Sequence, residues 1–176
     1  MKKLIRLGIV AITIAMFIIL FSAKENTAQT IPDRVEAVYR ATASATEIPL
    51  RVPSLIPLTS PAAPSEYWAS SIAPSPERYI ISFDRAEDCT NVEECSFAIA
   101  KGELNTESSL SFQELSAQVR NEAISLGNGT PAVFSPYREG LYTPTSIFVQ
   151  IDDYLYTFSI YMAEKEDVLE MVNSAL

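Results

Sequence analysis

The chain has 176 residues, of which 13 are Lys or Arg and 22 are Asp or Glu, so its formal charge is −9. Such an acidic chain repels phosphate backbones, which disfavours nucleic-acid binding. Histidine is absent, which excludes His-dependent catalytic triads, a His general base and His metal ligands. The length leaves room for one domain, and two cysteines cannot complete a four-thiolate zinc site.

A hydrophobic leader opens the sequence. Three basic residues lie among the first six, and an uncharged, predominantly apolar run follows at residues 7–23, which would span about 25 Å as a helix. That length favours an uncleaved membrane anchor, with a cleaved signal peptide as the alternative. Because the basic residues precede the run, both interpretations place the rest of the chain outside the cytoplasm. We therefore expect residues 1–25 to be a signal or anchor, attached to the membrane through residues 4–23.

Residues 26–64 are expected to form a helical stalk followed by a Pro-rich linker. Pro32 and Asp33 are typical of a helix start. Val35, Val38, Tyr39 and Thr42 then lie on one face of this helix at helical spacing. Five prolines between residues 47 and 64 exclude a helix or a central strand there. The segment is therefore an extended linker or an edge segment, part of which could lie along the domain.

Beyond residue 65 the apolar pattern switches to a period of two, which is typical of strands. The candidate segments are residues 66–72, 78–83, 96–101, 122–126, 132–134, 146–151 and 154–161. Asn128-Gly129 and Asp152-Asp153 each lie between two such segments, at positions typical of hairpin turns. Short turns join most of the segments, so we expect an antiparallel sheet of about six strands.

Two helices complete the predicted domain. Ser111-Phe112-Gln113-Glu114 fits a capping box, so a short helix should run to about residue 121. Residues 164–176 combine an acidic first turn with an apolar stripe and predict a closing helix. The expected fold is thus α+β: an antiparallel β-sheet of about six strands at residues 65–176, with two or three helices packed on one face, preceded by the N-terminal transmembrane or signal helix.

Several motifs after residue 65 resemble a family of bacterial envelope proteins of uncharacterised function. They are Tyr79-Ile80-Ile81-Ser82-Phe83 before Cys89-x5-Cys95, Leu126-Gly127-Asn128-Gly129, Phe148-Val149-Gln150 leading to Tyr154, and the ending Met171-Val172-Asn173-Ser174-Ala175-Leu176. The ending is also similar to C-terminal modules of unknown function attached to anti-sigma-type regulators. The resemblance implies an external α+β domain and brings no catalytic residues with it.

Cys89 and Cys95 are expected to form a structural disulfide outside the reducing cytoplasm. A redox pair is the alternative, but four acidic residues between positions 87 and 94 disfavour the reactive thiolate form. The same acidic residues, together with Asp84, could bind Ca²⁺. They do not match the EF-hand spacing, so a solvated acidic loop is the favoured interpretation.

Four aromatic residues in or near loop-like stretches could line a groove for a partner. They are Tyr67, Trp68, Tyr137 and Tyr142. Packing over the rim of the core is the favoured alternative, because amphipathic aromatic rings commonly lie there. Asp152 and Asp153 could be imagined as a catalytic carboxylate pair, but adjacent residues in a turn point apart, so the turn is favoured.

These observations predict a non-enzymatic extracytoplasmic domain, membrane-tethered or secreted, that binds or senses a partner in the cell envelope. The partner would be a protein, peptide or glycan, and we expect no cofactor, metal or catalytic residue. The first alternative is a carboxylate-only hydrolase of envelope glycans, which needs two carboxyl groups about 5–10 Å apart in a cleft. The second is a structural envelope component. The expected location is the cell membrane with a periplasmic or extracellular domain, or secretion if the leader is cleaved.

Overall fold

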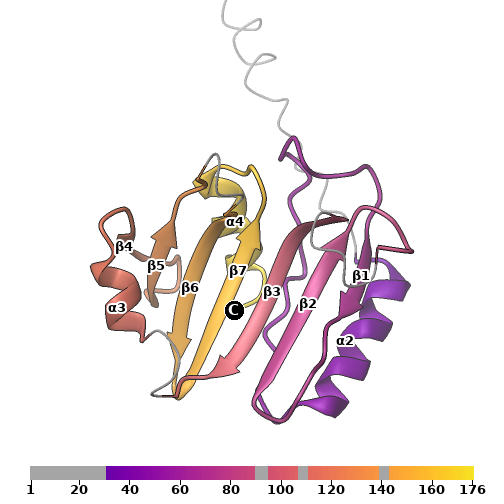
Figure 1. The fold of residues 1–176 in the computed structure, drawn as a ribbon, viewed down its shortest axis with the longest axis horizontal. Helices are drawn as coiled ribbons and strands as arrows, with labels where there is room; N and C mark the ends of the chain where they lie inside the picture. Colours follow the sequence, from indigo (N-terminus) through magenta and orange to yellow (C-terminus); the bar gives the residue numbers. More distant parts are fainter. Residues whose placement is uncertain (1–30, 90–94, 107–110, 139–142) are drawn as a thin grey trace, which may run out of the picture.

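The computed structural model describes residues 31–89, 95–106, 111–138 and 143–176. Within them, a seven-stranded antiparallel sheet and three helices form the α+β fold that the sequence predicts (Figure 1). The strands are β1 (Trp68–Ser71), β2 (Arg78–Asp84), β3 (Ser96–Leu104), β4 (Glu122–Ser125), β5 (Pro131–Ser135), β6 (Thr145–Ile151) and β7 (Tyr154–Ile160). The helices are α2 (Asp33–Ala45), α3 (Phe112–Ala117) and α4 (Lys165–Asn173).

The leader, residues 1–25, lies outside the described residues. Among the residues that are described, no helix is long and apolar enough to cross a membrane.

The sheet consists of two meanders that meet at its centre. The strand order is β1-β2-β3-β7-β6-β5-β4, so the last hairpin of the chain lies in the middle and pairs with β3 (Figure 1). Asp152 has φ 52° in the turn of that hairpin, and Gly129 has φ 83° between β4 and β5. Glycine and the short Asp side chain tolerate this left-handed backbone conformation. Both hairpins predicted from these turns are confirmed.

One face of the sheet holds the hydrophobic core, because successive side chains of a strand point to opposite faces. Fully buried side chains on this face include Tyr79, Ile81, Phe83, Ala98, Ala100, Ile147, Val149, Phe158 and Ile160. Helix α4 packs against β6 and β7 and buries Val168, Met171 and Val172, as its apolar stripe predicts. Helix α2 packs beside β1 at one edge of the sheet, and its Tyr39 contacts Phe83 edge-to-face.

Residues 46–64, which we call the strap, cross the core face in an extended conformation. Three buried tyrosine hydroxyls donate to strap carbonyls at every second residue. Tyr156 donates to Pro49 (3.0 Å), Tyr79 to Arg51 (3.0 Å) and Tyr39 to Pro53 (3.0 Å). Because proline has no N–H, the strap buries few backbone donors that would otherwise need partners. The proline-rich composition therefore suits a covering segment as well as a linker.

Helix α4 holds the same strap from the C-terminal end of the chain. Ser54 donates its backbone N–H and its hydroxyl to the Ser174 carbonyl, at 3.3 and 3.0 Å, and Leu55 donates to the Ser174 hydroxyl at 3.1 Å. Ile48 and Ile56 are each only 3% exposed. Residues 31–64 are thus an integral part of the domain rather than a stalk and linker before residue 65, because helix α2 and the strap complete the core.

Helix α3 departs from the expectation that all helices cover one face. It packs against β5 and β6 on the face opposite the core. There Leu115 forms a small second core with Val133 and Leu155, against which Phe112 and Phe148 pack. The physical reason lies in the strand pattern: apolar residues occur on both faces of the sheet at this end, so both faces need cover. No described helix covers β7, β3 or β2 on this second face.

Candidate functional site

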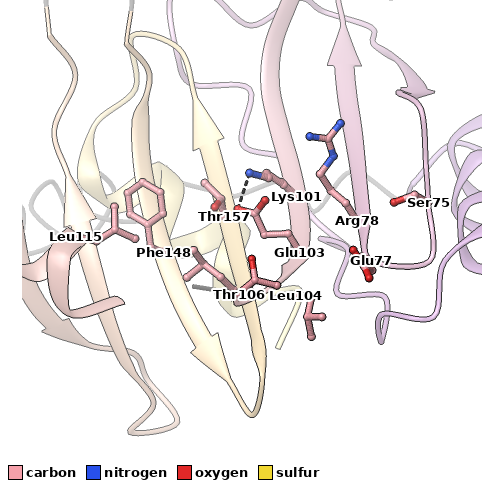
Figure 2. Close-up of a pocket in the computed structure, with 11 residues that line it drawn as sticks. Ser75, Glu77, Arg78, Lys101, Glu103, Leu104, Thr106, Leu115, Phe148 and Thr157 are labelled. Carbon is pink, nitrogen blue, oxygen red and sulfur yellow. Dashed lines mark hydrogen bonds and ion pairs between the residues drawn. The ribbon is translucent and has the colours of Figure 1, made fainter. Parts of the chain in front are cut away.

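The sheet face opposite the core carries a hollow of about 660 Å³ over β2, β3, β7 and β6 (Figure 2). We call it the open-face hollow. Strand register builds its floor from two rows of side chains, each crossing neighbouring strands. The rows are Lys101–Thr157–Phe148 and Arg78–Glu103–Leu155. Residues far apart in the sequence therefore lie together because antiparallel pairing aligns them.

The hollow has an apolar end, formed where α3 meets the sheet. Leu115 and Leu155 are 5% and 3% exposed, and Phe148 packs against them. A capping box fixes the start of α3: the Glu114 N–H donates to the Ser111 hydroxyl (3.2 Å), and the Ser111 N–H donates to the Glu114 carboxylate (2.8 Å). That second hydrogen bond lowers the pKa of Glu114. The predicted capping box is therefore confirmed, and it positions Leu115 in the wall of the hollow.

The other end of the hollow is rich in hydrogen-bond donors. Lys101 Nζ forms an ion pair with Glu103 Oε1 at 2.6 Å. The Arg78 side chain is exposed, and within the described part of the chain its guanidinium has no side-chain partner. Figure 2 shows the nitrogen atoms of Arg78 and Lys101 near each other, with Glu77 on the same side of the hollow as Arg78. Apart from the ion pair with Glu103, the N–H groups of Arg78 and Lys101 at this end therefore have no side-chain acceptor among the described residues.

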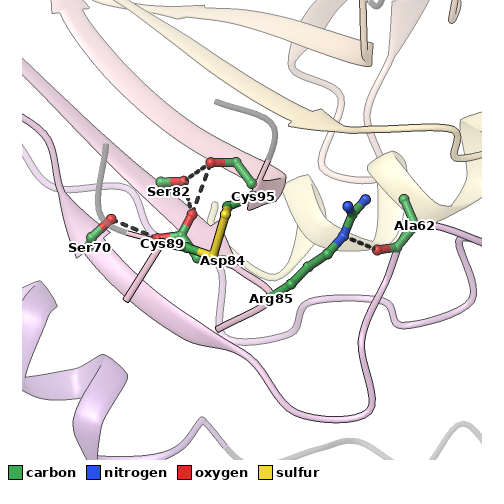
Figure 3. The surroundings of a disulfide bond; sticks show 8 residues. Ala62, Ser70, Ser82, Asp84, Arg85, Cys89 and Cys95 are labelled. Atoms are coloured by element: carbon green, nitrogen blue, oxygen red, sulfur yellow. Dashed lines mark hydrogen bonds between the residues drawn. A yellow bond between two sulfur atoms is a disulfide. The ribbon is translucent and has the colours of Figure 1, made fainter. Parts of the chain in front are cut away.

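Cys89 and Cys95 form the predicted disulfide, which joins the segment after β2 to the start of β3 (Figure 3). Their Cα atoms are 5.5 Å apart, a usual separation for such a bond. Arg85, between β2 and Cys89, donates from Nε to the Ala62 carbonyl of the strap at 2.9 Å. The segment between β2 and the disulfide therefore also contacts the strap, which fits the structural interpretation.

A buried carboxylate beside the disulfide was missed by sequence reasoning. Asp84 is 2% exposed and accepts hydrogen bonds from three hydroxyls, those of Ser82 (2.6 Å), Ser96 (2.9 Å) and Ser70 (2.8 Å). The hydroxyls come from β1, β2 and β3, so the carboxylate ties the three strands together (Figure 3). The sequence did contain a signal for this cluster. Serines occur within these strands, and the two-residue period of a strand places their side chains on the same face of the sheet as Asp84.

The acidic loop does not gather its carboxylates around one point in the described residues. The Asp84 carboxylate faces the three serines, whereas Glu87 and Asp88 are exposed. Glu93 and Glu94 lie outside the described residues. Asp152 and Asp153 are both exposed in the β6–β7 turn, so the turn interpretation holds for them.

The aromatic residues proposed as a partner-binding set do not lie together. Tyr67 is 1% exposed, and its ring packs edge-to-face against Phe83 and Phe97, so it belongs to the core. Trp68 is half-buried on edge strand β1, with the Arg34 guanidinium 4.7 Å from its ring centre. Tyr137 is half-buried after β5, five strand spacings away, roughly 24 Å. Tyr142 lies outside the described residues.

Comparison of the chain with models of known families, with curated proteins and with solved structures finds no match. The chemistry of the hollow therefore rests on its own residues.

Proposed function

We propose that the chain is a non-enzymatic domain of the cell envelope that binds a partner outside the cytoplasm through the open-face hollow. The observation that carries this proposal is the composition of the hollow, with the exposed Arg78 guanidinium and the Lys101 ammonium at one end and an apolar wall at the other. Its volume of about 660 Å³ falls within the range of about 300–1,000 Å³ usual for ligand sites. Convergent polar groups beside apolar side chains are the features that orient a bound molecule.

Binding is better supported than hydrolysis of a glycan. Two carboxylates line the open-face hollow, those of Glu77 and Glu103. Glu103 is ion-paired to Lys101, which leaves Glu77 as the carboxylate of the hollow without a described ion pair. A carboxylate-only hydrolase needs two carboxyl groups that face a common cleft. A purely structural component, the second alternative, would have no need of unpaired donors beside an apolar wall.

The external location rests on the leader and on the disulfide. The basic residues before the apolar run favour export of the remainder of the chain, with attachment through residues 4–23 unless the leader is cleaved. Disulfides such as Cys89–Cys95 persist in oxidising compartments and are rare in the cytosol. The resemblance to bacterial envelope proteins supports the same location.

Site-specific photo-crosslinking tests the proposal in intact cells of the organism that encodes the chain. Gln150 is exposed on β6, in the same row as Arg78 and Leu155, so a photoreactive benzoyl-phenylalanine there lies beside the hollow. Ala43 is exposed on helix α2, on the other side of the sheet, and provides the matched control position. We expect a discrete cross-linked product from position 150 that is absent from position 43.

The product should also disappear when Arg78→Gln is combined with the label at position 150. Equal labelling from both positions, or no product from position 150, would argue against a binding role for this face.

A further inference from the structure

The arrangement of the open-face hollow also indicates what kind of partner it takes. At one end, two cationic groups have N–H groups with no acceptor among the described residues: the Arg78 guanidinium and, apart from its ion pair with Glu103, the Lys101 ammonium. Of the two carboxylates that line the hollow, Glu77 and Glu103, that of Glu103 is already bound to Lys101 at 2.6 Å. A guanidinium near an ammonium fits a carboxylate, which accepts two parallel hydrogen bonds from arginine.

The apolar wall lies at a fixed distance from these donors. Arg78 is on β2 and Phe148 is on β6, and β3 and β7 separate the two strands. Three strand spacings amount to about 14 Å, which is the length of about four residues of extended peptide. An occupant that reaches both ends must therefore carry its carboxylate and its apolar group about that far apart.

We infer that the open-face hollow binds an extended peptide segment of about four residues, with a carboxylate at one end and an apolar side chain at the other. This inference rests on the proposed binding function and names its ligand class. The carboxylate pairs with Arg78 and with the Lys101 ammonium, and the apolar side chain packs on Phe148. The chain is acidic overall, but the Debye length at physiological salt is about 8 Å, so distant repulsion is screened while the direct pair with Arg78 persists.

Calorimetric titration of the full chain in neutral detergent micelles tests this assignment. The probe is the peptide acetyl-Phe-Ala-Ala-Glu with a free carboxyl terminus. We expect saturable binding that Arg78→Gln weakens tenfold or more, because a hydrogen-bonded charge pair is lost. Arg40→Gln is the control: it removes the same charge from an exposed position on α2, and it should leave the affinity unchanged.

Three further peptides separate the two requirements without altering the protein. Acetyl-Phe-Ala-Ala-Gln-amide lacks the carboxylates and acetyl-Ala-Ala-Ala-Glu lacks the aromatic group, so both should bind at least tenfold more weakly. Binding of acetyl-Phe-Ala-Ala-Lys-amide as tight as that of the acidic probe would overturn the inference, as would equal effects of Arg78→Gln and Arg40→Gln. If no peptide binds but position 150 still gives its cross-linked product, the ligand class is wrong while the binding function stands. If both experiments fail, the proposed function fails with them.

Discussion

Two kinds of residue-scale contact hold the strap and the central strands in place. Tyr39, Tyr79 and Tyr156 donate to strap carbonyls from three different elements. Gly102 lies in the register row between Tyr79 and Tyr156, and a Cβ atom there would overlap the ring of Tyr79. The absence of a side chain at this position therefore lets the two tyrosines approach the strap.

Gly102→Ala is expected to destabilise the domain by about 1–3 kcal/mol, because the new methyl group forces the Tyr79 ring out of a close-packed position. The matched control is Gly127→Ala, where a Cβ would be 3.8 Å from the Asn173 side chain, an ordinary contact. Urea unfolding of the two variants measures the difference. Equal midpoints for both variants would show that the core accommodates the methyl group.

Tyr79→Phe removes one hydroxyl that both accepts from the Arg51 N–H (3.1 Å) and donates to its carbonyl (3.0 Å). Leaving a buried backbone N–H or C=O group without its hydrogen-bond partner costs about 1–3 kcal/mol. We therefore expect Tyr79→Phe to lower the free energy of unfolding by that amount. Tyr137→Phe is the control, because Tyr137 is half-buried and no described hydrogen bond involves its hydroxyl. Thermal and urea melts compare the two, and an unchanged melt for Tyr79→Phe would mean that water replaces the bonds.

The same tyrosines predict how stability responds to alkaline pH. Burial raises the pKa of Tyr39 and of Tyr79 above the ordinary value of 10.0. Above pH 10 the unfolded chain therefore loses these protons while the folded domain keeps them. The stabilisation is complete below pH 10 and declines as pH rises above it, by up to about 1.4 kcal/mol per pH unit for each tyrosine. Urea unfolding between pH 9 and 11 should show this decline, and Tyr79→Phe should make it shallower. A stability that is constant over this range would contradict the assignment.

At the scale of elements, sequence periodicity predicts the strands and helices well where one face of an element is buried. The hairpins around Asn128-Gly129 and Asp152-Asp153 and the capping box at Ser111 are local signals, and each formed as expected. The strap is different because an extended Pro-rich segment has no amphipathic period, so its burial depends on distant tyrosines. The open-face hollow has the same origin: its residues meet only through strand register, which the sequence does not specify locally.

Helix α4 is the element whose packing the sequence predicts most directly. Met171 is fully buried against the sheet, and replacing a buried Met with Ala costs about 2–5 kcal/mol. We expect Met171→Ala to lower the free energy of unfolding by that amount and also to loosen the strap, because Ser174 of the same helix binds Ser54 and Leu55. Hydrogen exchange at Leu55 should therefore accelerate in this variant. Asn173→Ala, at an exposed position, is the control, and it should change neither property.

At the scale of the whole molecule, the core is assembled from both ends of the described chain. Val35 of α2, Ile56 of the strap and Val172 of α4 belong to one hydrophobic cluster. A domain that began at residue 65 would leave the core face of the sheet partly exposed. The domain therefore begins close behind the expected leader, and the strap cannot also serve as a free spacer between them.

Truncation tests this view of the domain boundary. We expect a chain of residues 65–176 to be unfolded or aggregated, because it lacks α2, the strap and the carbonyls that accept from Tyr79 and Tyr156. A chain of residues 31–176 should keep a cooperative thermal melt, since it contains the whole described core. Circular dichroism and sedimentation compare the two, with both chains kept oxidised so that the Cys89–Cys95 disulfide is present in each. A cooperative melt for residues 65–176 would show that the core is stable without α2 and the strap. The domain boundary would then lie near residue 65, as the sequence predicts.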